Sequence, residues 1–198
     1  YDSMRAEQEH LVPLISEKLE QGYKNIIVEC PTGSGKSALS YWLPLIFNSK
    51  AYISTPLKGL QQQYINDHPF MASAMGKANY KCVLEDDVLE DLELSGCNAS
   101  NAPCRVIEDY QCAHALTKED LERVMIGETF TSPCGYYSAY AEALKNRWFI
   151  GNTTYLTAMR LFGNPVLPTR PLLIVDEAHT VPQTIEQFCG FSLSRKRI

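Results

Sequence analysis

Three features that would point to a membrane protein, a secreted protein or a nucleic-acid coat are missing from the sequence. No apolar run approaches the ~20 residues that a membrane-spanning helix needs. The first residues, Tyr1 to Arg5, show no basic segment followed by an apolar one, as a secretory signal would. Positive charge is scarce, because 18 Lys and Arg stand against 23 Asp and Glu, giving a net charge of −5. We therefore expect an intracellular protein without a membrane partner, whose contacts with phosphate groups are confined to local sites.

Closely spaced cysteine pairs are missing as well. The sequence has seven cysteines, an odd number, and no secretory signal, so a disulfide framework is not expected. No two cysteines show the Cys-x₂₋₄-Cys spacing that is usual in structural zinc sites. Five of the seven lie between His68 and Asn146. Widely spaced thiols in one segment favour a centre large enough to be held from separate parts of the chain, with zinc as the alternative.

Apolar runs and helical patterns alternate at both ends of the sequence. Near-continuous apolar strands that alternate with helices are typical of a parallel sheet covered on both faces. The expected strands are 25–30, 51–54, 148–151 and 172–175, and the expected helices are 3–21, a run from Lys36, 57–65 and 154–162. The alternation stops between 68 and 146. We predict an α/β domain formed by residues 1–67 and 147–198 and interrupted by an insert, residues 68–146.

The segment Cys30 to Ser37 reads Cys-Pro-Thr-Gly-Ser-Gly-Lys-Ser and lies between an expected strand and an expected helix. This context predicts a phosphate-binding loop, in which backbone N–H groups and the helix N-terminus surround the phosphates. The strict pattern begins with glycine, where this sequence has Cys30. Lys36 would reach the β- and γ-phosphates and Ser37 would coordinate Mg²⁺. The expected ATP-binding residues of the loop are Thr32, Gly33, Ser34, Gly35, Lys36 and Ser37.

An acidic pair, Asp176 and Glu177, directly follows the last expected strand. A carboxylate at the carboxyl end of a parallel strand faces the crevice in which open α/β sheets bind ligands. Asp176 would hold Mg²⁺, directly or through water, and Glu177 would position and deprotonate the attacking water. The alternative is a surface pair that caps the next helix.

These residues resemble the superfamily 2 helicases that carry an Asp-Glu-Ala-His box, here residues 176–179, and among them the XPD/DinG family. Residues 5–8, 54–63 and 152–156 are similar to three further motifs of that family. The resemblance implies a RecA-like P-loop fold in which Gln8 reads adenine and residues 54–63 contact the DNA backbone. It also implies that His179 couples the nucleotide site to the strand-binding surface.

Four segments of the insert resemble the ligand segments of the family's iron–sulfur domain. The resemblance implies a mostly helical insert and a 4Fe–4S cluster, which requires four thiolates. The implied ligands are Cys82, Cys104, Cys112 and Cys134. Cys97 is the alternative to Cys104, and Gly135 stands where the family usually has proline. The tyrosines at 136, 137 and 140 either stack on bases or pack locally, and local packing is the preferred interpretation.

The function implied is that of an ATP-dependent 5′–3′ DNA helicase acting on single-stranded DNA or a forked duplex, in the nucleoid-containing cytoplasm or the nucleus. In the family, arginines from a second RecA-like domain complete the ATP site, and we expect this chain alone to hydrolyse ATP very slowly. Two alternatives stay open. One is an ATP-gated nucleic-acid-binding module that never unwinds, and the other is a P-loop ATPase or kinase with a structural zinc insert.

Overall fold

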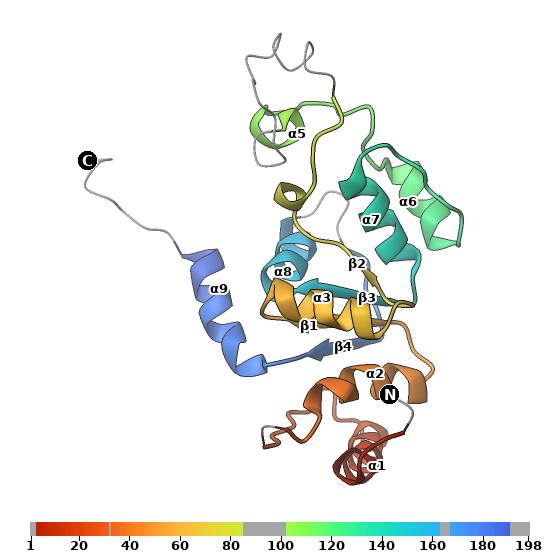
Figure 1. The fold of residues 1–198 in the computed structure, drawn as a ribbon, viewed down its shortest axis with the longest axis vertical. Coiled ribbons are helices and arrows are strands. Elements are labelled where there is room, and N and C mark those ends of the chain that lie inside the picture. The colour runs from red at the N-terminus through yellow and green to blue at the C-terminus, as the bar shows by residue number, and fades with distance from the viewer. Residues whose placement is uncertain (1–2, 32, 85–101, 163–166, 191–198) are drawn as a thin grey trace, which may run out of the picture.

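A computed structural model describes residues 3–31, 33–84, 102–162 and 167–190. Four parallel strands form one sheet in the order β2-β3-β1-β4 (Figure 1). Their bounds are β1 Ala51–Thr55, β2 Ala72–Ser73, β3 Trp148–Asn152 and β4 Leu172–Val175. All five residues of β1 are buried, as expected for an interior strand of a sheet with both faces covered. The predicted α/β architecture with a parallel sheet is therefore confirmed.

Helices surround this sheet and extend from it at both ends (Figure 1). The α-helices are α1 Ala6–Glu20, α2 Lys36–Ile46, α3 Lys58–Asp67, α5 Pro103–Val106, α6 Lys118–Met125, α7 Gly135–Lys145, α8 Thr153–Phe162 and α9 Val181–Cys189, with 3₁₀ turns η1 Lys77–Asn79 and η2 Ala178–Thr180. The four helices expected outside the insert correspond to α1, α2, α3 and α8. Among the described helices, none combines the length and the apolar character needed to cross a membrane.

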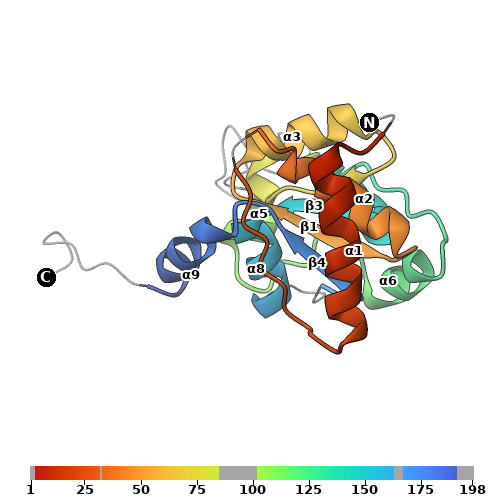
Figure 2. The same ribbon diagram turned by 90° about the horizontal axis from the view of Figure 1, so that it is seen from below.

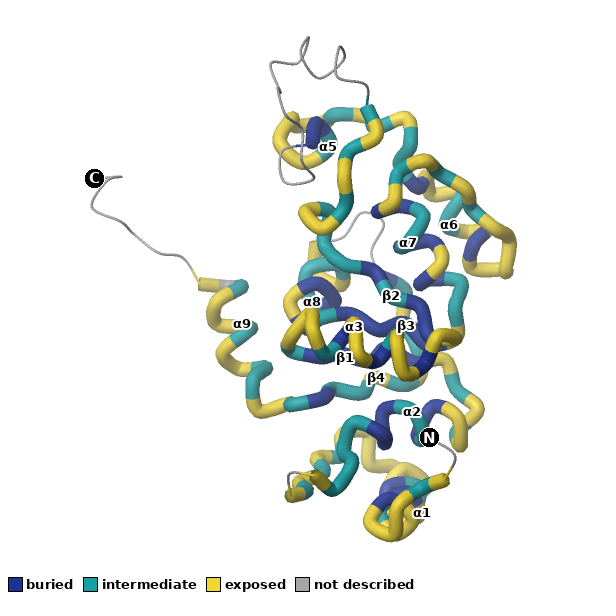
Figure 3. Tube along the Cα trace, in the orientation of Figure 1, coloured by how far each residue is buried: buried dark blue, intermediate teal, exposed yellow. Residues whose placement is uncertain are grey.

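The two faces of the sheet carry separate apolar clusters, because side chains alternate along a strand. Tyr52 and Phe149 pack on one face with residues of α7 and α8. Ile53 and Ile150 pack on the other face with Tyr64 of α3. Figure 2 shows α3 and α8 on opposite sides of the sheet, and Figure 3 shows β1 and β3 among its most buried segments. The sheet is thus held between two helical layers.

The strand predicted at 25–30 is wrong, since these residues form no strand. Within the described chain, β4 pairs with β1 alone and none of its hydrogen bonds reaches residues 25–30. Ile26 and Val28 still turn inward and pack with the α1–α2 cluster, whereas Ile27 is 93% exposed. The apolar run therefore reflects packing against helices and not membership of the sheet.

The insert predicted at 68–146 shares its core with the sheet. Strand β2 lies inside this range and pairs with β3, although its two residues gave no pattern in the sequence. Helix α7 contributes Tyr136, Tyr137 and Tyr140 to the cluster that covers β3. These three residues are 5%, 8% and 1% exposed, so their rings pack locally and offer no open face to a nucleic-acid base.

Arg170 joins helix α7 to the start of the sheet. Its guanidinium donates to five backbone carbonyl oxygens, those of Ala51, Ala143, Leu144, Asn146 and Arg147, at 2.9 to 3.0 Å. It also lies 4.6 Å from the centre of the Tyr52 ring. Burial lowers the pKa of Arg170 below its ordinary value, but a guanidinium stays charged in proteins. The cation therefore satisfies the last carbonyls of α7 and fixes that helix to the strands.

Replacing Arg170 with lysine is expected to lower the free energy of unfolding by about 2 to 4 kcal/mol, because one ammonium cannot serve five carbonyl oxygens. Urea unfolding followed by circular dichroism measures this loss. The matched control is Arg123→Lys, since Arg123 forms an exposed ion pair with Glu128 at 2.6 Å. Such pairs contribute about 0 to 1 kcal/mol. Equal losses from the two substitutions would contradict the role given to Arg170.

Candidate nucleotide site and cysteine pocket

The predicted phosphate loop has the backbone conformation that its glycines allow. Gly33 and Gly35 have φ angles of +84° and +78°, in the left-handed region that favours glycine. Gly35 is the N-cap of α2, so the loop leads directly into that helix. The Lys36 ammonium donates to the Cys30 carbonyl oxygen at 3.0 Å, across the loop. Thr32, another predicted ATP-binding residue, lies outside the described residues.

Residues at the start of α1 form hydrogen bonds to the backbone of the loop. Arg5 Nη1 donates to the Gly33 carbonyl oxygen at 2.9 Å, and Gln8 Nε2 donates to the Gly35 carbonyl oxygen at 3.0 Å. Gln8 Oε1 accepts from the Arg5 backbone N–H at 3.0 Å, and the Gln8 side chain is buried. The amide of Gln8, expected to read adenine, thus contacts protein at both of its ends. One of its two partners is the loop backbone, at Gly35.

Asp176 lies at the carboxyl end of β4 and faces the loop. Its backbone N–H donates to the Ser54 carbonyl oxygen of β1 at 2.9 Å. Its Oδ2 atom lies 3.5 Å from Ser37 Oγ, although the two residues are 139 positions apart in the chain. Its Oδ1 atom accepts from the Glu177 backbone N–H at 3.0 Å. The residues expected to bind Mg²⁺ therefore lie side by side, next to Lys36.

Glu177 has an uncommon backbone conformation, with φ 52° and ψ 47°. The left-handed region costs a non-glycine residue roughly 1 to 2 kcal/mol, and such residues cluster at functional sites. The Glu177 carboxylate is partly exposed and lies 3.3 Å from His179 Nδ1. This backbone turns the chain sharply after β4, so that Glu177 and His179 contact each other beside Asp176.

Tyr64 belongs to the site, although the sequence analysis did not predict a role for it. Its hydroxyl lies 3.0 Å from Asp176 Oδ2 and 3.2 Å from both Ser40 Oγ and the Ser37 carbonyl oxygen. Burial, reinforced by the charge of Asp176, raises the pKa of Tyr64 above its ordinary value, so the hydroxyl keeps its proton. The sequence pattern that could have indicated Tyr64 is its spacing from Gln61. The two residues are three positions apart on α3 and share the buried face of that helix.

Residues similar to the other family motifs connect strand ends. Ser54 Oγ lies 2.9 Å from Thr153 Oγ1, which donates to the Thr55 carbonyl oxygen at 3.1 Å. Gln61 Nε2 reaches the carbonyl oxygens of Ala74 and Ile150, on the neighbouring β2–β3 side. These buried hydrogen bonds fix the ends of β1 and β3 next to Asp176.

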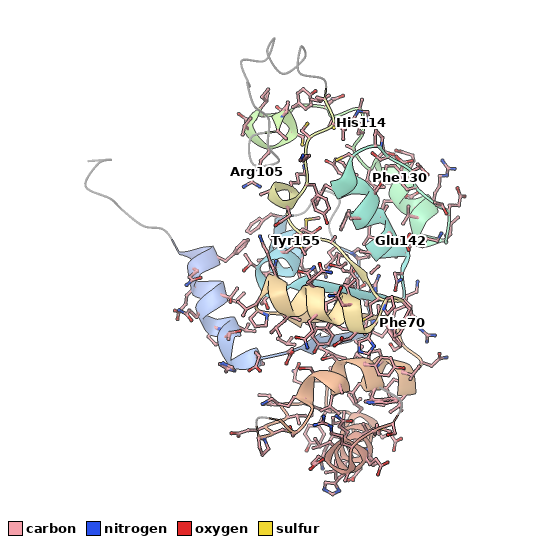
Figure 4. The ribbon with its side chains drawn as sticks, in the orientation of Figure 1. Phe70, Arg105, His114, Phe130, Glu142 and Tyr155 are labelled. Carbon is pink, nitrogen blue, oxygen red and sulfur yellow. The ribbon has the colours of Figure 1, made fainter. Side chains whose placement is uncertain are left out.

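The four cysteines expected to bind a cluster line one pocket in the insert: Cys82, Cys104, Cys112 and Cys134. His114, labelled in Figure 4, also lines this pocket. Cys134 is the N-cap of α7, so its side chain lies at the start of that helix. Cys97 lies outside the described residues.

Two lysines, Lys81 and Lys77, line this pocket, and Lys77 lies close to two of its aromatic rings. Its ammonium lies 5.5 and 5.3 Å from the ring centres of Tyr136 and Tyr137. Burial raises the pKa of Cys104, whereas the charge of Lys77 acts to lower it. Within the described ranges, no three Cys, His, Asp or Glu side chains are placed to hold a single metal ion. The structure brings the thiols to one pocket but does not by itself define a metal centre.

The fold is that of an α/β domain with a four-stranded parallel sheet, compatible with a RecA-like domain. The chain is similar to the ATP-dependent DNA helicase YoaA of Haemophilus influenzae, with 25% identity over 230 aligned positions. The match covers 98% of this chain but 36% of YoaA, so the chain spans about a third of the length of that relative. No protein-family model matches the chain.

The loop geometry predicts different costs for alanine at its two glycines. A methyl group at Gly33 meets nothing within 4 Å, whereas one at Gly35 overlaps the Gln8 amide nitrogen. Gly33→Ala should cost about 1 kcal/mol for the left-handed backbone alone. Gly35→Ala should cost about 1 kcal/mol more, because it also breaks the Gln8 hydrogen bond. Chemical unfolding of both variants measures the difference, and equal costs would show that Gln8 does not support the loop.

Proposed function

We propose that this chain is the ATP-binding part of an ATP-dependent DNA helicase. The observation that carries the proposal is the 3.5 Å approach of Ser37, in the glycine-rich loop, to Asp176 at the end of β4. The similarity to YoaA, which is an ATP-dependent DNA helicase by name, supports it. Lys36, Ser37 and Asp176 would hold the triphosphate with Mg²⁺, which neutralises charge on the transferred phosphoryl group when bound.

Glu177 is the proposed general base and His179 the proposed link to the nucleic-acid surface. The carboxylate of Glu177 is partly exposed and contacts His179 Nδ1 at 3.3 Å. A base at this position would orient and deprotonate the attacking water. Gln8 would first support the loop through Gly35 and could offer its second amide N–H to adenine.

The nucleic acid would bind near the start of α3. Leu57 is 63% exposed there, and Lys58 Nζ donates to Asn79 Oδ1 of the insert at 2.7 Å. A backbone phosphate could compete for this ammonium, consistent with the family role of residues 54–63. We place the motor in residues 1–67 and 147–198, the insert in 68–146, and the completing arginines in a second RecA-like domain. Translocation would run 5′ to 3′ along single-stranded DNA and open a forked duplex.

Two substitutions separate ATP binding from hydrolysis. Lys36→Ala should weaken Mg²⁺–ATP binding at least about tenfold, because it removes the cation of the loop. Glu177→Gln should keep Mg²⁺–ATP binding within about threefold but slow single-turnover hydrolysis at least about a hundredfold, because the base is lost. Equilibrium binding and single-turnover hydrolysis, with single-stranded DNA present, measure both.

The control for these variants is Lys18→Ala, an exposed residue of α1 whose ammonium contacts Gln21. It should leave binding and hydrolysis unchanged. If Lys36→Ala binds Mg²⁺–ATP as the unmodified protein does, the loop is not a nucleotide site. A strand-displacement assay of the full-length protein on a forked duplex tests unwinding. ATP hydrolysis by the full-length protein without displaced strand would favour the module that binds without unwinding.

For the cysteine pocket we propose a 4Fe–4S cluster. Four thiols from separate segments line one pocket, and four thiolates are the ligands of such a cluster. Cys134 is the N-cap of α7, and the Lys77 charge acts against the raised pKa that burial gives Cys104, so positive potential reaches two of the four sulfur atoms. When bound, a cluster would cross-link these four segments and stabilise the fold of the insert.

Protein prepared without oxygen should contain about four iron and four labile sulfide per chain. Cys112→Ser should lose most of both, because the cluster loses one ligand. Cys30→Ser is the matched control, since Cys30 lies in the phosphate loop and should leave the iron unchanged. Cys104→Ser and Cys97→Ser, compared directly, identify the remaining ligand. Stoichiometric zinc without sulfide would contradict the cluster and establish the zinc alternative.

A further inference from the structure

Tyr64 connects three elements at the candidate nucleotide site. It belongs to α3, and its hydroxyl reaches Ser40 and the Ser37 carbonyl oxygen of α2 and Asp176 after β4. The ring packs in the apolar cluster between α3 and the sheet, and the residue is 5% exposed. The hydroxyl is therefore held where the phosphate-loop helix and the end of β4 meet.

A tyrosine hydroxyl has one proton to donate, and here three oxygen atoms surround it. The carboxylate is the strongest acceptor among them, because hydrogen bonds to an ionised group are shorter and stronger. Its distance of 3.0 Å is also the shortest of the three. The Tyr64 hydroxyl consequently donates its hydrogen bond to Asp176 Oδ2, while the Ser40 hydroxyl can donate to the Tyr64 oxygen.

Asp176 depends on this donor for its orientation. The residue is 9% exposed, and its Oδ1 atom accepts from the Glu177 backbone. The other contact of Oδ2, with Ser37 Oγ, is 3.5 Å long and therefore weak. Without Tyr64, a buried carboxylate oxygen would lack a good donor, which costs free energy until the side chain turns elsewhere.

We propose that Tyr64 is a positioning residue that holds the Asp176 carboxylate in the orientation used to bind Mg²⁺–nucleotide. The inference rests on the proposed function, because it assigns Mg²⁺ to Asp176. Tyr64 does not touch the nucleotide and acts through Asp176. Loss of its hydroxyl should affect the Mg²⁺ dependence of nucleotide binding more than the binding of nucleotide without the metal.

The test compares Tyr64→Phe with unmodified protein by titrating a fluorescent non-hydrolysable ATP analogue at a series of Mg²⁺ concentrations. The Mg²⁺ concentration that gives half-maximal binding should rise about three- to tenfold, while binding in EDTA changes less than about twofold. Tyr52→Phe is the matched control, because the Tyr52 hydroxyl donates a partly buried hydrogen bond to the Pro168 carbonyl oxygen at 2.7 Å, away from the site. It should leave the Mg²⁺ dependence unchanged.

Two further variants separate positioning from general packing. Ser40→Ala removes a neighbour of the Tyr64 hydroxyl but keeps its bond to Asp176, so the Mg²⁺ dependence should stay as in unmodified protein. In an Asp176→Asn background, Tyr64→Phe should have no additional effect on that dependence. A rise caused by Ser40→Ala, or a Tyr64→Phe effect that persists in Asp176→Asn, would overturn the proposal in favour of packing.

The outcomes distinguish failure of the positioning role of Tyr64 from failure of the proposed function on which it rests. If unmodified protein shows Mg²⁺-dependent binding and Tyr64→Phe matches it, the positioning role is refuted and the nucleotide site stands. If unmodified protein binds the analogue with no dependence on Mg²⁺, both are refuted. Thermal unfolding confirms that each variant is folded at the temperature of the titration. Ser40→Ala tests the proposal even where Tyr64→Phe does not fold.

Discussion

The parallel register of β3, β1 and β4 is the constraint on which the candidate site depends. Thr55 pairs with Asn152 and Ser54 with Val175, so the three strands end at one edge of the sheet. Asp176 is the next residue, and its backbone donates to the Ser54 carbonyl oxygen. Because strand side chains alternate, a slip of one residue would turn β4 over and carry the carboxylate away from Ser37. The ladder of hydrogen bonds therefore decides where the acidic pair lies.

The sequence was informative where a local pattern has a local cause. Apolar runs predicted β1 and β3 because interior strands of a covered parallel sheet are apolar throughout. An apolar run also predicted β4, which lies at the edge of the described sheet. Glycine spacing predicted the left-handed turns of the loop, since few other residues adopt them. The same reasoning failed at 25–30, because a strand also needs a neighbour to pair with. It missed β2, whose two residues are too few to show any period.

Contacts between distant segments could not be predicted from the sequence, for a different reason. Arg170 and Tyr64 are ordinary residues in their local surroundings, and their roles come from partners more than twenty positions away. Arg5, which reaches the Gly33 carbonyl oxygen, is another example. The cysteines were easier to select because thiols are scarce and chemically distinctive. Their common pocket is formed by loops and helix ends that no period reveals.

The shared core of sheet and insert means that the insert is not a detachable module. Helix α7 begins at the cysteine pocket, with Cys134 as its N-cap, and ends under the guanidinium of Arg170. An excision along the boundaries suggested by the sequence would remove this helix together with β2. It would uncover Phe149, which is fully buried, and leave a charged guanidinium without most of its acceptors. A minimal version of the sheet must therefore keep both β2 and α7, so that only the segment between these two elements can be removed.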